Sequence, residues 1–300
     1  MRPKHGLITI TSLLLVIFSI ASGWAAEAHR KWGMSPYIGL YEPSLKLLNK
    51  GEFRSPYEGT ADLIDQFGNN NNVTVPLIFR APLPALSPGP IAGLDFIWRI
   101  NDKHDLLLGA GNWESVSSTS NPGVFPVQGA FESVIAQRKG NISFTEFHLG
   151  WRYNVVRKPN DHDFFLSFSI HDVFDVRYRE DFSLLFLSGP PRSFRKSSII
   201  ESRATGLLLL QGTGGGEWFI NNWFSLSAEA GYVVGLKALR LGNGNLTTDF
   251  KSTDNLFLEL PIIQNASGNM QYKTENGEGY RNLKLSFEGW KALIKATIYY

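Results

Sequence analysis

The chain has 300 residues, with 29 Lys and Arg, 27 Asp and Glu, and no cysteine. This length allows one large or two ordinary domains. The absence of cysteine excludes disulfides, thiolate metal ligands, cysteine nucleophiles and a lipid-modified cysteine. A formal net charge of +2 gives no basis for nucleic-acid binding, which we do not expect.

The first 26 residues have the composition of a secretory signal peptide. Arg2 and Lys4 form a positively charged start, and an apolar run over residues 7–20 follows. Small residues then permit cleavage, and the run is shorter than the roughly 20 residues of a membrane-spanning helix. We predict a signal peptide over residues 1–26, which leaves a nearly neutral chain over residues 27–300.

The rest of the chain is dominated by segments in which apolar and polar residues alternate. A period of two is that of β-strands, and helical stripes are scarce. About eight such segments are found, at residues 35–47, 93–100, 106–113, 147–155, 164–170, 205–218, 224–234 and 290–300. Residues 73–83 could add a strand that pairs with another loop segment and raise the number to ten, but two prolines oppose this.

The connections between these segments alternate strictly between short and long. Three are short turns, near Asn101, Pro159 and Asn221. Four are long and rich in Gly, Asn, Ser and Pro, near residues 48–88, 118–140, 180–202 and 242–281. Short periplasmic turns and long external loops are typical of outer-membrane β-barrels.

The last segment, Trp290–Tyr300, has an apolar residue at every second position and ends on an aromatic ring. It resembles the final strand of bacterial outer-membrane β-barrels, whose C-terminal aromatic residue is read by the barrel assembly machinery. The whole pattern resembles small outer-membrane barrels of the type that includes the OmpA transmembrane domain, OmpX and OmpW. The resemblance implies an all-β fold, a closed antiparallel up-and-down transmembrane barrel of about eight strands, in the outer membrane of a Gram-negative bacterium.

The faces opposite the apolar ones carry charges of both signs. In a closed barrel the apolar faces meet lipid and the charges can pair inside. An interior formed by about eight strands is roughly filled by side chains. We therefore predict a salt-bridged lumen in place of a wide channel. Its predicted members are Asp95, Arg99, His148, Arg152, His171, Asp175, Arg177, Glu229, Lys291 and Lys295.

Two further sets of residues are of the types that contact lipid headgroups. Amphipathic rings favour the headgroup level, and six aromatic residues near the short turns or the C-terminus form a predicted girdle: Trp98, Tyr153, Phe164, Trp218, Trp223 and Tyr300. Four loop cations could bind lipopolysaccharide phosphates, although they could equally belong to a solvated loop: Arg192, Arg195, Lys196 and Arg203.

The evidence for catalysis is weaker. His148, His171 and Asp175, with Ser167 and Ser169 beside them, could form a Ser–His–acid set. Serine and histidine occur on the polar face of any barrel, however, so we interpret these residues as members of the lumen. The Gly-rich stretch at residues 212–216 lacks the Lys-Ser/Thr of a phosphate loop. We expect no enzyme activity, no cofactor and no metal.

The sequence thus predicts a monomeric outer-membrane barrel with a structural or surface-interaction role. Its expected partners are outer-membrane lipids, lipopolysaccharide and, during biogenesis, the assembly machinery. Two other functions stay open, a narrow pore for small solutes and a lipid-modifying enzyme. A soluble secreted all-β protein is the alternative fold.

Overall fold

The computed structural model describes residues 31–45, 57–64, 70–79, 85–86, 88–127, 130–158, 161–187, 196–204, 206–240, 242–249, 262–264, 270–273, 280–282 and 284–300. The predicted signal peptide over residues 1–26 lies outside these ranges, as do Arg192 and Arg195. Within them, no helix is long and apolar enough to cross a membrane.

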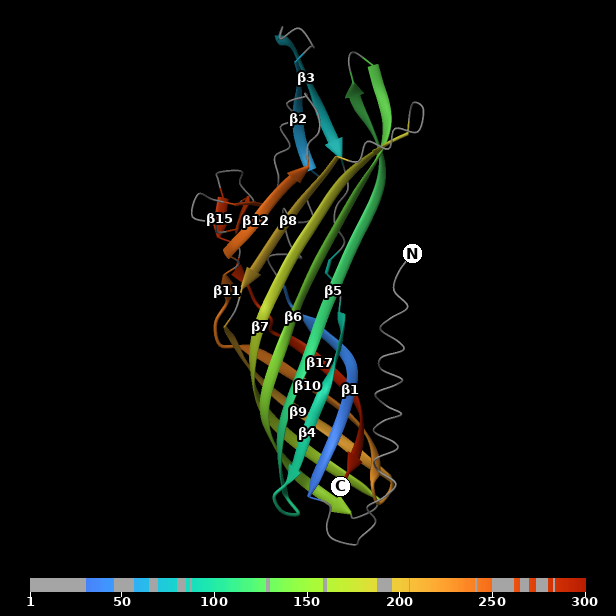
Figure 1. Cartoon of the computed structure of the whole chain (residues 1–300), viewed down its shortest axis with the longest axis vertical. Helices are drawn as coiled ribbons and strands as arrows, with labels where there is room; N and C mark the ends of the chain where they lie inside the picture. Colours follow the sequence, from blue (N-terminus) through green and yellow to red (C-terminus); the bar gives the residue numbers. More distant parts are fainter. Residues whose placement is uncertain are drawn as a thin grey trace.

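Eight strands close into an antiparallel barrel (Figure 1). In order around the barrel they are β1 (Trp32–Pro43), β4 (Gly89–Arg99), β5 (His104–Val127), β6 (Ala130–Lys158), β7 (His162–Phe186), β9 (Leu207–Asn221), β10 (Phe224–Gly235) and β17 (Gly289–Tyr299). The last strand pairs with the first, from Gly33 opposite Tyr299 to Pro43 opposite Gly289. The predicted closed up-and-down barrel of eight strands is confirmed, and each alternating segment corresponds to one of its strands.

A hairpin outside the barrel wall accounts for the segment that raised the alternative of ten strands. Strands β2 (Tyr57–Ile64) and β3 (Asn70–Phe79) pair with each other in a separate two-stranded sheet. Because this hairpin does not join the barrel sheet, the barrel keeps eight strands.

Three barrel strands continue far beyond the barrel on one side. Strands β5, β6 and β7 have 24, 29 and 25 residues, whereas β1, β4 and β17 have 12, 11 and 11. The upper part of β7 pairs with β8 (Lys196–Ala204), which pairs with β12 (Gly242–Asp249). We call this protruding sheet the extension, and the opposite end, which carries the short turns, the turn end (Figure 1).

The expectation of loops at residues 118–140 and 180–202 was therefore wrong for most of these residues, which are paired strands. Backbone pairing needs no apolar alternation, so a sheet outside the barrel leaves a weak sequence pattern. Smaller pairings lie outside the barrel: β11 (Leu239–Arg240) with β16 (Lys284–Leu285), and a three-stranded sheet of β13 (Ile262–Gln264), β14 (Met270–Lys273) and β15 (Tyr280–Asn282).

Asparagine side chains close two of the short turns. Asn101 Oδ1 accepts hydrogen bonds from the backbone N–H groups of Lys103 and His104, at 2.9 and 3.0 Å. Asn221 Oδ1 accepts from Trp223 and Phe224, at 2.9 and 2.8 Å. An asparagine that bonds the backbone two or three residues ahead shapes a tight turn, which explains the short β4–β5 and β9–β10 connections.

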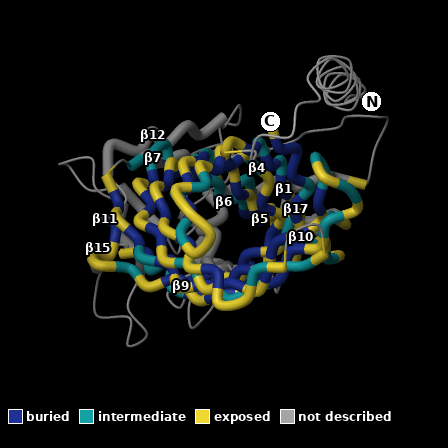
Figure 2. Tube along the Cα trace, turned by 90° about the horizontal axis from the view of Figure 1, so that it is seen from below, coloured by how far each residue is buried: buried dark blue, intermediate teal, exposed yellow. Residues whose placement is uncertain are grey.

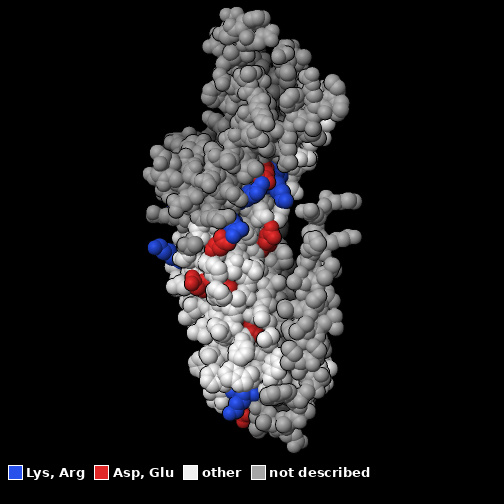
Figure 3. Space-filling model, in the orientation of Figure 1, with Lys and Arg blue, Asp and Glu red and all other residues white. Residues whose placement is uncertain are grey.

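Burial alternates along the barrel strands (Figure 2). On β17, Lys291 and Lys295 are buried, whereas Trp290 and Ile294 are 65% and 63% exposed. The charged face therefore points into the barrel and the apolar face points out. In the space-filling view, charges gather at the lower tip and in the upper half of the described surface, with a largely uncharged band between them (Figure 3).

Candidate functional site

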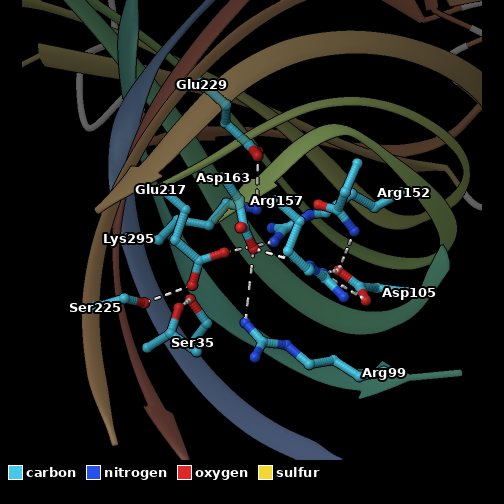
Figure 4. A network of polar contacts seen from close by, with 12 residues as sticks. Ser35, Arg99, Asp105, Arg152, Arg157, Asp163, Glu217, Ser225, Glu229 and Lys295 are labelled. Atoms are coloured by element: carbon cyan, nitrogen blue, oxygen red, sulfur yellow. Dashed lines mark hydrogen bonds and ion pairs between the residues drawn. The ribbon is translucent and has the colours of Figure 1, made fainter. Parts of the chain in front are cut away.

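The lumen at the turn end holds a layer of three arginines and three carboxylates, which we call the lower ion layer: Arg99, Arg152, Arg157, Asp105, Asp163 and Glu217. Arg152 donates to Glu217 at 2.9 Å. Arg157 donates to both oxygens of Asp105, at 3.0 and 2.9 Å, and to Asp163 at 3.1 Å. These side chains come from β4, β5, β6, β7 and β9 and point toward one another (Figure 4). The layer is balanced in charge.

A second layer, the middle layer, lies next to it and contains three carboxylates, two lysines and two histidines: Asp95, Glu146, Glu229, Lys291, Lys295, His148 and His171. Lys295 Nζ donates to Asp95 at 2.6 Å and lies 2.8 Å from Glu229. Lys291 Nζ donates to Glu146 at 2.6 Å. All seven side chains are buried, so each charge depends on a partner from another strand for its stability.

A chain of three side chains in the middle layer has the order of a nucleophile, a base and an acid. Ser169 Oγ lies 2.7 Å from His171 Nε2, and His171 Nδ1 lies 3.1 Å from Glu146 Oε2. The ring of His148 lies 4.8 Å from that of His171 and bonds Asp95 at 2.9 Å. The acid of this set is Glu146, whereas the sequence pointed to Asp175.

Aromatic and aliphatic side chains fill the lumen on the extension side of these layers. We call this group the apolar plug; it includes Tyr41, Trp113, Phe144 and Phe287. The ring centroids of Trp113 and Phe144 are 5.2 Å apart, and those of Phe144 and Phe287 are 5.4 Å apart. Trp113 Nε1 donates to the Tyr41 carbonyl at 3.1 Å. Sequence analysis missed the plug, although the inward position of Trp113 follows from the alternation along β5.

Little free space remains in the described lumen. A cavity of about 20 Å³ lies in the middle layer beside Ser169, His171, Gln211 and Thr213. That volume suits about one water molecule. The arrangement of these described side chains can therefore hold charges, protons and a bound water.

Eight of the ten predicted lumen residues lie in the lumen: Asp95, Arg99, His148, Arg152, His171, Glu229, Lys291 and Lys295. Five of them contact one another, whereas Arg99, Arg152 and Lys291 pair with Asp163, Glu217 and Glu146. Asp175 and Arg177 do not lie in the lumen, and that prediction was wrong. A β-bulge inserts an extra residue into β7 near Asp175, whose φ is +51°. The bulge shifts the alternation, so Val176 and Tyr178 face inward and Asp175 and Arg177 face outward.

Five lumen charges were missed by sequence analysis: Asp105, Glu146, Arg157, Asp163 and Glu217. Glu146 shares the inward face of β6 with His148, so extending that alternation by one step would have found it. Arg157 lies two residues before Pro159, in the region where the sequence predicts a short turn. A second register shift, between Asn154 and Val156, precedes it, and its guanidinium bonds Asp105 and Asp163.

The predicted girdle residues lie near the turn end. Five of them are exposed on the outer wall: Trp98, Tyr153, Phe164, Trp218 and Tyr300. Trp223 lies in the β9–β10 turn and is half-buried. Trp32, which sequence analysis missed, stacks on Trp98 with ring centroids 5.1 Å apart.

The predicted lipopolysaccharide cluster is only partly within the described residues. Lys196 and Arg203 lie at opposite ends of β8, opposite Leu184 and Arg177 of β7. Arg192 and Arg195 lie outside the described ranges. Binding of lipopolysaccharide by this cluster stays a prediction.

One group in the described lumen has donor atoms within 4.8 Å of one another, as a metal site would: Glu146, His148 and His171. The Lys291 ammonium already lies 2.6 Å from Glu146, and His148 bonds Asp95. The ammonium at the carboxylate opposes a metal ion electrostatically. We therefore interpret the group as part of the charge network.

No protein-family model matches the sequence, and no curated protein does. Among solved structures, the chain is similar to the outer membrane protein OprG of Pseudomonas aeruginosa, with 11% identity over 92% of this chain and 99% of that chain and a TM-score of 0.37. It is also similar to the outer membrane protease OmpT of Escherichia coli, with 9% identity, 93% and 99% coverage and a TM-score of 0.32. These scores are low, so the architecture rests on the strand pairing itself, which is that of a closed antiparallel barrel of eight strands.

Proposed function

We propose that this chain is a monomeric outer-membrane barrel with a closed lumen and a structural or surface-interaction role. The observation that carries the proposal is the filled interior. Two layers of buried, paired charges and an apolar plug occupy the described lumen, and the cavity within the middle layer measures about 20 Å³. Such an interior stabilises a barrel and opposes transport, so the narrow-pore alternative has less support.

The outer wall supports the membrane location. Large apolar side chains are exposed along every barrel strand, and in water they would form a patch far larger than soluble monomers tolerate. Lipid would cover this surface, while the closed ring of hydrogen bonds leaves no unpaired strand edge in the membrane. The turn end would face the periplasm and the extension would face outside.

Cell fractionation with a heat-shift gel tests this proposal. We expect the protein in the outer-membrane fraction, with a change in SDS-gel mobility on boiling, because a closed barrel resists detergent until it is heated. A soluble periplasmic or extracellular protein with no heat shift would contradict the membrane barrel.

The surface role is assigned to the extension. Strands β5 to β8 and β12 form a sheet beyond the barrel, and a protruding sheet offers backbone groups and side chains to a partner. Removal of residues 118–138 would shorten the β5–β6 hairpin. We expect the heat shift to persist in this variant, while adhesion or ligand binding of intact cells is lost.

The Ser169, His171 and Glu146 chain supports a second candidate, a lipid-modifying hydrolase. Its distances are those of an activated serine, but the described cavity holds about one water, so a substrate would need the lumen to open. Labelling with a fluorophosphonate probe tests this candidate. Label on the wild type that is absent from Ser169→Ala would support a hydrolase, and the absence of label from both would remove it.

A further inference from the structure

A groove of about 450 Å³ runs across the outer wall of the barrel, over strands β1 and β4 to β7. Ile38, Pro90 and Ala92 form one end of it, and Glu114 and Arg177 contribute to the other. The apolar end therefore lies on β1 and β4, and the charged end spans β5 to β7.

The two ends lie at different heights above the turn end. Strand β1 begins at the turn end with Trp32, and Ile38 is the sixth residue after it. Strand β7 begins at the same end with His162, and Arg177 is the fifteenth residue after it. Each residue of a strand adds roughly 3.3 Å along its direction. The apolar end is thus level with the exposed apolar side chains of the outer wall, which we call the apolar belt. The charged end is close to where the extension begins.

The register explains why the wall is hollow at the charged end. Glu114 of β5 lies opposite Ser143 of β6, and Ser143 lies opposite Arg177 of β7. A small side chain therefore separates two long, oppositely charged ones. In the neighbouring row, Thr145 donates to Asn112 at 2.7 Å, which supplies polar groups to the groove floor.

The β7 bulge fixes the cation at the groove. Asp175, at the bulge, has a φ of +51°, a left-handed conformation that costs energy for a residue other than glycine. Its carboxylate pairs with Arg177, whose Nε donates to Oδ1 at 2.9 Å. A locally strained backbone thus holds the guanidinium beside Ser143, and the side chain of Arg177 stays 51% exposed.

The charges of the groove select a class of ligand. Its charged lining residues are one cation, Arg177, and two carboxylates, Glu114 and Asp175. A strongly anionic headgroup would be repelled by the carboxylates, whereas a headgroup with both a phosphate and an ammonium complements them. The phosphate would bind Arg177 and the ammonium Glu114, while an acyl chain follows Ile38, Pro90 and Ala92 into the apolar belt.

We propose that this groove binds one zwitterionic phospholipid with an amine-bearing headgroup, of the phosphoethanolamine type. The inference rests on the proposed membrane location and orientation, which place the charged end of the groove in the outer leaflet. The site would therefore select a zwitterionic phospholipid in the presence of lipopolysaccharide, whose anionic phosphates the two carboxylates disfavour. It names a lipid and a site that differ from the loop cations predicted to contact lipopolysaccharide.

Lipid retention by the purified full-length barrel tests the proposal. Protein extracted from membranes in mild detergent is stripped of lipid, incubated with phosphatidylethanolamine, phosphatidylglycerol or lipopolysaccharide, and analysed by native mass spectrometry. We expect one bound phosphatidylethanolamine. Its retention should exceed that of phosphatidylglycerol by about fivefold, because the ammonium adds one partly exposed ion pair with Glu114. Arg177→Gln should lose this lipid, and Glu114→Gln should lose the preference.

Arg179→Gln is the matched control. Arg179 lies two residues farther along β7, is 47% exposed and pairs with Asp181, but it does not line the groove. The lipid site would be overturned if phosphatidylglycerol or lipopolysaccharide were retained as well as phosphatidylethanolamine. It would also be overturned if Arg177→Gln and Arg179→Gln lost equal amounts of phosphatidylethanolamine. A heat-shifted barrel that retains no lipid overturns this site alone, whereas a wild type without a heat shift overturns the membrane barrel and the site together.

Discussion

Glu217 of β9 connects four strands through its two carboxylate oxygens. Oε2 accepts from Arg152, and Oε1 accepts from Ser225 and Tyr299. These partners come from β6, β10 and β17, and the Arg152 and Glu217 side chains are 1% and 0% exposed. Burial of a charge is tolerated only when it is paired and hydrogen-bonded. The loss of this single carboxylate should therefore affect half of the barrel wall.

We expect Glu217→Gln to destabilise the barrel by roughly 3–5 kcal/mol, since it leaves the buried Arg152 without its counter-charge. The free energy of unfolding in urea, measured on the barrel refolded in lipid vesicles, checks this value. Asp181→Asn makes the same chemical change in the partly exposed Arg179 pair and should cost less than about 1 kcal/mol. Equal effects of the two substitutions would contradict a stabilising role of the lower ion layer.

Gly109 leaves space for the pair of Asp95 and His148. A Cβ at this position would lie 2.3 Å from Asp95 Oδ1 and 2.4 Å from His148 Nε2. We expect Gly109→Ala to displace that pair and to cost roughly 1–3 kcal/mol of unfolding free energy. Gly212→Ala, where nothing lies within 4 Å of the added Cβ, should leave the urea midpoint nearly unchanged. If both variants unfold at the wild-type midpoint, the middle layer is looser than the structure indicates.

At the scale of the element, the bulge in β7 decides which side chains face the lumen. Between Phe174 and Arg177 the strand has one residue more than its partner β6, and the inward positions change from Val173 to Val176 and Tyr178. The extra residue also places Asp175 and Arg177 on the outer wall. The same irregularity therefore fills the apolar plug and supplies the cation of the groove.

Deletion of Asp175 should be tolerated, because it removes the extra residue and keeps Val176 and Tyr178 facing inward. Deletion of Phe96 from β4, a strand without a register shift, should prevent folding, since no bulge can absorb it and it reverses the faces of the residues on one side of it. The fraction of each variant that shows the heat shift after refolding measures the difference. Similar yields for the two deletions would contradict the assigned bulge.

At the scale of the whole molecule, the lumen and the outer wall differ in polarity. The interior combines balanced ion pairs with an apolar plug, and the outer wall carries the apolar surface for lipid. Above them, the extension places β5 to β8 beyond the barrel. A closed barrel with a protruding sheet agrees with the proposed surface role.

We expect the purified barrel to show no discrete conductance steps in planar lipid bilayers, because the filled lumen leaves room for about one water. Insertion is checked separately by the heat shift of protein recovered from the same vesicles. Regular single-channel steps from inserted wild-type protein would contradict the closed lumen and would favour the narrow-pore function.

Sequence alternation by itself determined the eight barrel strands, the inward position of eight lumen residues and the polarity of both faces, because a period of two is a local property of each strand. Only the tertiary structure decided which charges meet. Lys291 bonds Glu146 across 145 positions of the sequence, and this depends on closure and register. It also decided the faces of Asp175, Arg177 and Arg157, since a bulge reverses the alternation beyond it. The extension is held by backbone pairing outside the barrel, which leaves only a weak pattern in the sequence.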